Sequence, residues 1–104
     1  MSEISEKTLL FYKVSDLLKQ IRAKIKPFTE ATSAGFETPE DFLTELNEDI
    51  AKIETCDIST LNKINTEFLP TGTYQELSLS NGWADEYSEM ADTFDELYTA
   101  IQNQ

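Results

Sequence analysis

The apolar residues between positions 83 and 101 recur at alternating steps of four and three, and this spacing strongly constrains the fold. It places them on one stripe of an α-helix with 3.6 residues per turn. The stripe consists of Trp83, Tyr87, Met90, Phe94, Leu97 and Ile101. A sustained repeat of this kind is typical of the buried seam in an antiparallel helical bundle. The sequence therefore predicts a helix near 83–102 that packs against other helices.

Two other long segments, near 5–26 and 39–54, show the same periodicity. The first carries an apolar stripe formed by Leu10, Val14, Leu17, Ile21, Ile25 and Phe28. Pro27 disfavours helical geometry at the residue before it, so this helix should stop or kink there. In the second segment, Thr38 suits the N-cap and Pro39 suits the first helical position. Both segments are predicted to be helices.

A shorter helix is expected near 58–69, where Asp57 or Ser59 can cap the start and Pro70 ends it. The connection 70–82 alternates weakly between apolar and polar residues, which permits a short extended piece. The 104 residues fit one domain. The sequence thus predicts an all-α fold, a compact bundle of about four helices in which residues 1–104 form a single helical domain. An irregular orthogonal bundle is the alternative.

Cysteine content and hydropathy indicate a cytoplasmic protein. Cys56 is the only cysteine, so the chain cannot form an internal disulfide. The segment Met1–Lys7 is charged and lacks the apolar stretch of a secretory signal. No apolar run approaches the roughly 20 residues that cross a bilayer. We therefore expect no membrane association.

Charge is distributed unevenly along the chain, which has a formal net charge of −12. Residues 1–26 carry six bases and three acids, residues 27–63 carry nine acids and two bases, and residues 64–104 carry eight acids and no base. Phosphate recognition depends on clustered Lys and Arg, so direct nucleic-acid binding is not expected. An anionic membrane surface is disfavoured for the same reason.

The acids of the last predicted helix share one side of it. Asp85, Glu89, Asp92 and Glu96 are offset by two residues from the apolar stripe, with Glu86 and Asp95 beside them. Two residues correspond to about 200° of rotation, so these carboxylates should lie opposite the buried seam. The resulting acidic face either keeps the protein soluble or binds a basic partner. In another interpretation, Lys19, Arg22 and Lys26 pair with acids across the bundle or across a dimer.

Most catalytic chemistry is disfavoured by what the chain lacks. It has no histidine and no glycine-rich phosphate loop, and we predict no catalytic residue, metal ligand or cofactor. The enzyme class that survives is a magnesium-dependent all-α nucleotide phosphohydrolase. Three pairs have the carboxylate spacing that such enzymes use: Glu45 with Glu48, Glu86 with Glu89, and Glu89 with Asp92. In a chain with twenty acids, this spacing also arises by chance.

The leading functional prediction is a non-enzymatic small acidic protein that binds a basic protein partner. The specific function that we predict is that of an immunity-protein or antitoxin-like inhibitor, which covers the cationic site of an enzyme such as a nuclease. The predicted partner-binding residues are Asp85, Glu86, Glu89, Asp92, Asp95, Glu96 and Trp83. Core packing is the default role of Trp83, and an aromatic anchor in the interface is its second possible role. Two different functions stay open: the magnesium-dependent phosphohydrolase, and a homo-oligomeric helical module without catalytic function.

Overall fold

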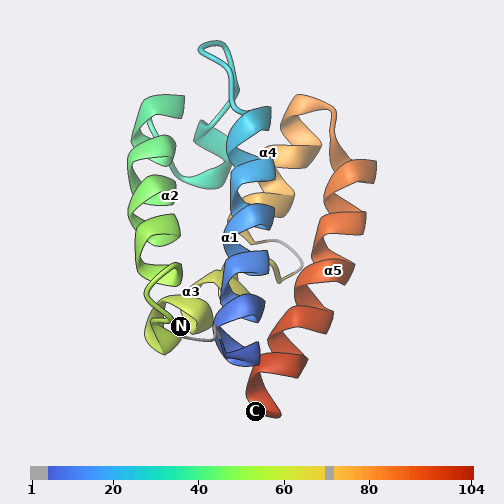
Figure 1. Ribbon diagram of the computed structural model, residues 1–104. Coiled ribbons are helices and arrows are strands. Elements are labelled where there is room, and N and C mark those ends of the chain that lie inside the picture. Colours follow the sequence, from blue (N-terminus) through green and yellow to red (C-terminus); the bar gives the residue numbers. More distant parts are fainter. Residues whose placement is uncertain (1–4, 70–71) are drawn as a thin grey trace.

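The computed structural model describes residues 5–69 and 72–104, and every regular element in these ranges is helical (Figure 1). The elements are α1 (Glu6–Lys24), the short 3-10 helix η1 (Thr32–Ala34), α2 (Pro39–Ile53), α3 (Ile58–Glu67), α4 (Thr73–Asn81) and α5 (Ala84–Gln102). The predicted all-α class is confirmed, and the four expected helices begin and end within two residues of their predicted bounds. Among these helices, none is both long enough and apolar enough to cross a bilayer.

The prediction of a short extended piece within residues 70–82 is wrong, because α4 occupies Thr73–Asn81. Tyr74, Leu77 and Ser78 are buried and share one helical face. Leu79 lies on the other side with 58% of its surface exposed, which hides the helical pattern in the sequence. Gly82 then ends the helix in the left-handed conformation, with φ at 82°. The described part of the chain therefore has five α-helices, and residues 70–71 lie outside it.

Side-chain caps set the starts of the first three α-helices. The Ser5 hydroxyl accepts a hydrogen bond from the Thr8 amide, and Thr38 accepts one from Asp41. Asp57, rather than Ser59, caps α3 by accepting from two backbone amides. Each cap satisfies amide groups that have no partner inside the helix. The predicted stop before Pro27 is also present, since α1 ends at Lys24 and Ile25 is extended.

The core lies between α1 and the helices on either side of it. In Figure 1, α1 runs between α2 and α5, and it packs against both. The predicted seam of α5 faces inward, with Tyr87, Met90, Phe94 and Ile101 buried. Phe68, at the end of α3, stacks on Phe94 with ring centroids 4.5 Å apart. Helix α4 closes the remaining side against α5 and η1.

Candidate binding surface

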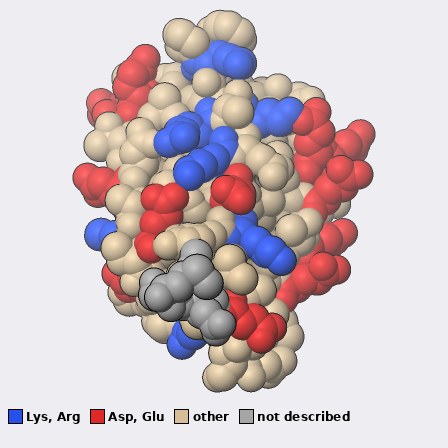
Figure 2. Space-filling view, in the orientation of Figure 1, with Lys and Arg blue, Asp and Glu red and all other residues tan. Residues whose placement is uncertain are grey.

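Six acids of α5 lie on the surface of the protein, and we call them the acidic surface. They are Asp85, Glu86, Glu89, Asp92, Asp95 and Glu96, and all six are exposed. Helical geometry accounts for this arrangement, because the buried seam occupies the opposite side of α5. Figure 2 shows acidic side chains along the α5 edge of the molecule, next to basic side chains over α1. The structure thus brings the six predicted acids together on one helix.

Little positive charge reaches this surface. Within residues 5–69 and 72–104, the one ion pair that involves the acidic surface joins Lys24 of α1 to Glu86. The last turn of α5 carries no base. The other five acids therefore repel one another at helical spacing, at a cost of about 0.2–0.5 kcal/mol per pair in an isolated helix. Five of the six acids of the acidic surface therefore have no ion pair among the described residues.

Other bases of α1 bind elsewhere in the bundle. Lys19 pairs with Glu54, which follows α2, at 3.0 Å. Hydrogen bonds from Lys19 and from Ser15 hold the pKa of the Glu54 carboxyl below its usual value. Arg22 donates a hydrogen bond of 2.9 Å to the side-chain oxygen of Asn47. The predicted pairing across the bundle thus occurs for Lys19, and it directs that charge toward α2 rather than α5.

Trp83 lies in the core, immediately before α5. Only 5% of its surface is exposed, and its ring packs edge-on against Tyr87 at 6.5 Å. Its indole nitrogen is buried and has no hydrogen-bond partner among the described residues. The six acids are therefore exposed, whereas Trp83 is buried. Trp83 thus makes the core contacts that the sequence predicts as its default role.

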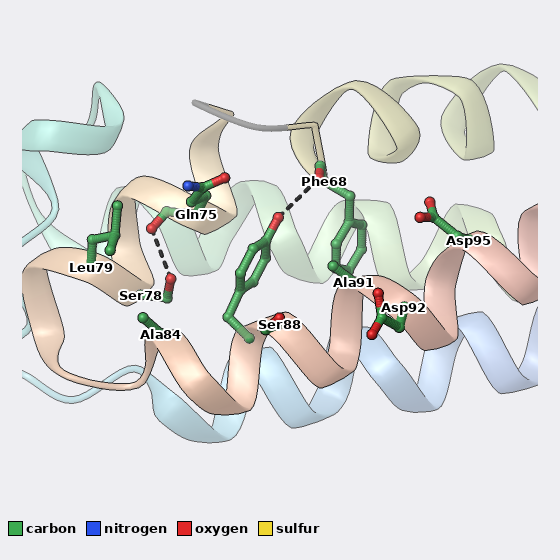
Figure 3. A pocket seen from close by; sticks show the side chains of 10 residues that line it. Phe68, Gln75, Ser78, Leu79, Ala84, Ser88, Ala91, Asp92 and Asp95 are labelled. Carbon is green, nitrogen blue, oxygen red and sulfur yellow. Dashed lines mark hydrogen bonds between the residues drawn. The ribbon is translucent and has the colours of Figure 1, made fainter.

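A groove of about 310 Å³ lies between α4 and α5, beside the acidic surface (Figure 3). Its lining includes the apolar residues Phe68, Leu79, Ala84 and Ala91, together with the acids Asp92 and Asp95. The Tyr87 hydroxyl donates a hydrogen bond of 2.9 Å to the Phe68 carbonyl, which ties α5 to the end of α3 at this point. The groove was not predicted, because it exists only where α4 packs on α5.

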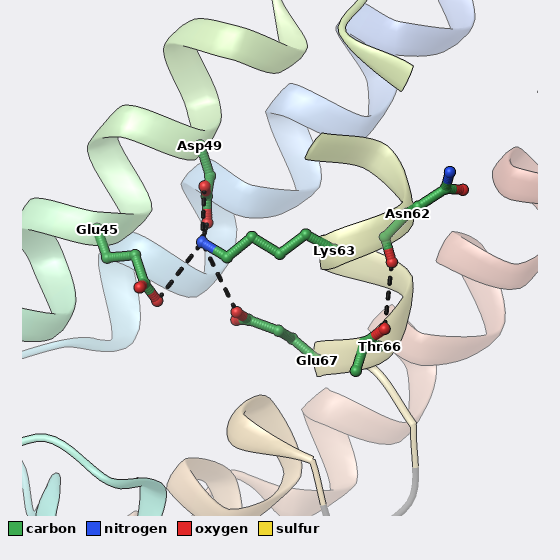
Figure 4. A network of polar contacts seen from close by, with 6 residues as sticks. All are labelled: Glu45, Asp49, Asn62, Lys63, Thr66 and Glu67. Atoms are coloured by element: carbon green, nitrogen blue, oxygen red, sulfur yellow. Dashed lines mark hydrogen bonds and ion pairs between the residues drawn. The ribbon is translucent and has the colours of Figure 1, made fainter. Parts of the chain in front are cut away.

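A second polar site lies between α2 and α3, around Lys63 (Figure 4). The Lys63 ammonium is 3.0 and 2.9 Å from the two carboxylate oxygens of Asp49. It is also 3.7 Å from Glu45 and 3.9 Å from Glu67. We call these three acids and Lys63 the Lys63 cluster. Burial lowers the pKa of Lys63, but the hydrogen bonds and charge of Asp49 outweigh it and raise the pKa overall.

The Lys63 cluster has an excess of negative charge in a partly buried place. Asp49 is only 4% exposed, although carboxylates are rarely buried unless they are paired. Burial raises the pKa of Glu67, the charge of Lys63 opposes this, and the charges of Glu45 and Asp49 raise it further, which together bring the pKa to about 7. One lysine therefore does not fully compensate three carboxylates.

The three carboxylate pairs proposed for magnesium do not form separate clusters. Glu48 is exposed, and Asp49, one turn after Glu45, faces Lys63 instead. The other two pairs belong to the exposed acidic surface. In the described part of the chain, one group of three acids has oxygens within 4.8 Å of one another, namely Glu45, Asp49 and Glu67. The spacing of Lys63 and Glu67, four residues apart, was the available sequence signal.

Comparisons of the chain with protein-family models, with curated proteins and with solved structures found no match. Function must therefore be inferred from the residues themselves. Three features of the described residues bear on function: the acidic surface, the groove beside it and the Lys63 cluster.

Proposed function

We propose that this chain is a non-enzymatic binding protein whose acidic surface contacts a basic protein partner. The supporting observation is that six acids are exposed on one helix, while one ion pair among the described residues, from Lys24 to Glu86, reaches them. An immunity-protein or antitoxin-like inhibitor is the concrete form of this proposal. Such a protein neutralises a basic enzyme by covering its cationic site.

The physical advantage of the acidic surface is electrostatic. A field of one sign steers a cationic partner during diffusion and excludes anionic competitors. Charged rim contacts mainly raise the association rate, and salt screens them over about 8 Å at physiological ionic strength. The proposed complex should therefore form rapidly in dilute buffer and weaken as salt is added.

The groove between α4 and α5 gives the proposed interface an apolar part. Leu79, Ala84 and Ala91 can contact an apolar side chain of the partner, since interface energy is concentrated in desolvated pockets. Asp92 and Asp95 line the same groove and can pair with neighbouring Lys or Arg of that partner. In this proposal, Trp83 supports the start of α5 from within the core.

Affinity capture with matched charge variants tests the proposal. The surface variant combines Asp85→Asn, Glu89→Gln and Asp92→Asn. The control combines Glu37→Gln, Glu40→Gln and Glu48→Gln, three exposed acids on or just before α2, which packs against α1 and α3. We expect the wild type and the control to retain a basic protein that the surface variant loses. Retention by all three proteins would refute the proposal.

Self-association is a second candidate, because the charges of the chain are segregated. Lys13, Lys19 and Arg22 belong to α1, whereas the acids of α5 lie along the neighbouring edge (Figure 2). A second copy could place its α1 against this acidic surface. Sedimentation of the wild type and the surface variant separates the two proposals, because only self-association makes the mass depend on those acids without another protein.

A magnesium-dependent phosphohydrolase stays a third candidate. The carboxylates that gather, Glu45, Asp49 and Glu67, surround the Lys63 ammonium. A magnesium ion would first have to displace that lysine. Hydrolysis of a nucleoside triphosphate that requires Mg²⁺ and is lost in Asp49→Asn would favour this candidate.

A further inference from the structure

The carboxylates of the Lys63 cluster are spaced as ligands of one ion. Glu45 and Asp49 lie one turn apart on α2, and Glu67 approaches from α3. One oxygen from each lies within 4.8 Å of the others. Oxygens that bind calcium at about 2.3–2.6 Å are separated by at most about 5 Å across the ion. The three groups are therefore close enough to share a single divalent cation.

Burial shows which members of the cluster are fixed and which can move. The side chains of Asp49 and Glu67 are 5% and 12% exposed, whereas that of Lys63 is 41% exposed. Lysine has a long flexible stem that can carry its ammonium into solvent. Asp49 directs both carboxylate oxygens at the same cation, as a bidentate ligand does. The Glu45 side chain is 40% exposed, so it is as free to adjust as Lys63. Lys63 can thus leave while Asp49 and Glu67 stay in place.

An independent feature of α4 also points to this position. The Tyr74 side chain is fully buried, and its hydroxyl completes no hydrogen bond of normal geometry with the described residues. Burial raises the pKa of this phenol, and the nearby carboxylates of Glu67, Asp49 and Glu45 raise it further. The hydroxyl therefore lies beside the cluster and interacts with the Glu67 carboxylate, but it makes no hydrogen bond of normal geometry with the described residues. Burying a polar group with its hydrogen bonding incomplete is costly.

We propose that Glu45, Asp49 and Glu67 bind one divalent cation of the calcium or magnesium type, and that Lys63 takes the same position when no such ion is bound. A divalent ion supplies two positive charges where the ammonium supplies one. It therefore compensates three carboxylates more completely than Lys63 does. Water completes the coordination shell, and the Tyr74 hydroxyl donates a hydrogen bond to a water or carboxylate oxygen of that shell. This site lies on α2 and α3 and is independent of the proposed acidic surface.

Calcium titration of matched proteins by calorimetry tests this site. In Lys63→Met the competing ammonium is gone, so affinity for Ca²⁺ should rise by at least roughly tenfold, equivalent to about 1.4 kcal/mol. Adding Asp49→Asn to Lys63→Met should abolish that gain. The surface variant of α5 is the control for nonspecific attraction of cations to an acidic protein. The proposal is overturned if Lys63→Met binds Ca²⁺ no more tightly than the wild type.

A measurement on the wild type avoids reliance on a variant that fails to fold. Paramagnetic Mn²⁺ broadens the amide signals of residues near the ion in a nuclear magnetic resonance spectrum. Broadening should begin at residues around Asp49 and Glu67, at Mn²⁺ concentrations that leave the α5 signals sharp. Broadening that begins on α5, or is uniform over all acids, would contradict the site.

Discussion

The Lys24 ammonium of α1 pairs with the Glu86 carboxylate of α5, and within the described residues no other base forms an ion pair with the acidic surface. Lys19 pairs with Glu54 and Lys63 pairs with acids of α2 and α3. These bases thus neutralise acids on or just after α2 and on α3, and most of the negative charge of α5 has no paired base among the described residues. This relationship is the physical basis of the proposed binding function.

Replacing Lys24 with Gln should slightly destabilise the fold and strengthen binding of a basic partner. The pair is partly exposed, with side chains 31% and 55% exposed, so the free energy of unfolding should fall by less than about 1 kcal/mol. Binding of a basic partner should become tighter, since Glu86 is released. Urea denaturation measures the first effect and calorimetry the second. Weaker partner binding in Lys24→Gln would count against the acidic surface.

The stacked pair of Phe68 and Phe94 should dominate the stability of the bundle. Phe94 is fully buried, so Phe94→Ala should lower the free energy of unfolding by about 3–5 kcal/mol through lost burial and a residual cavity. Phe28→Ala is the matched control, because 86% of Phe28 is exposed and its effect should be within about 0.5 kcal/mol. Similar losses in both variants would show that α5 does not pack as described.

Gly82 tests the end of α4. Its φ of 82° lies in the left-handed region, and a Cβ added there would meet no atom within 4 Å. Gly82→Ala should therefore cost about 1–2 kcal/mol through backbone strain alone. Gly82→Asn should cost less, because Asn tolerates this conformation. Thermal denaturation gives the order of the three proteins, and equal stability of all three would contradict the left-handed cap.

Glu67 should give the protein a distinctive pH dependence in a buffer with a chelator. Its folded pKa of about 7 exceeds the ordinary value of 4.5, so the folded state holds the proton more tightly than the unfolded state does. This contribution to stability is complete below pH 4.5 and is lost as the pH rises through 7. Glu67→Gln should flatten the denaturation profile in this window. Glu48→Gln should not, and equal slopes in Glu67→Gln and the wild type would refute the assignment.

The long helices could be predicted because their signals are local. Thr38 and Pro39 mark the start of α2, and the three-four repeat from Trp83 to Ile101 identifies the buried side of α5. Once that side is known, the exposure of the six acids follows from helical geometry. None of these features depends on how the helices pack against one another.

Helix α4, the groove and the Lys63 cluster could not be predicted from the sequence, because they depend on tertiary packing. Helix α4 has only two buried apolar residues, Tyr74 and Leu77, and exposed Leu79 disguises its periodicity. Its packing on α5 also creates the groove, which was missed for this reason. Likewise, Asp49 and Glu67 are 18 positions apart, and only the packing of α2 against α3 brings them to the same ammonium. Helical spacing within one element cannot reveal such a cluster.

Calorimetry with the captured and purified partner tests the binding function of the acidic surface most directly. The affinity of this partner is measured for the wild type, the surface variant and the α2 control, at low and at high salt. We expect the surface variant to lose affinity by at least roughly tenfold, and the wild type to bind more weakly at high salt. The control should bind like the wild type. Equal affinity of the surface variant and the wild type at low salt would contradict a binding function for the acids of α5.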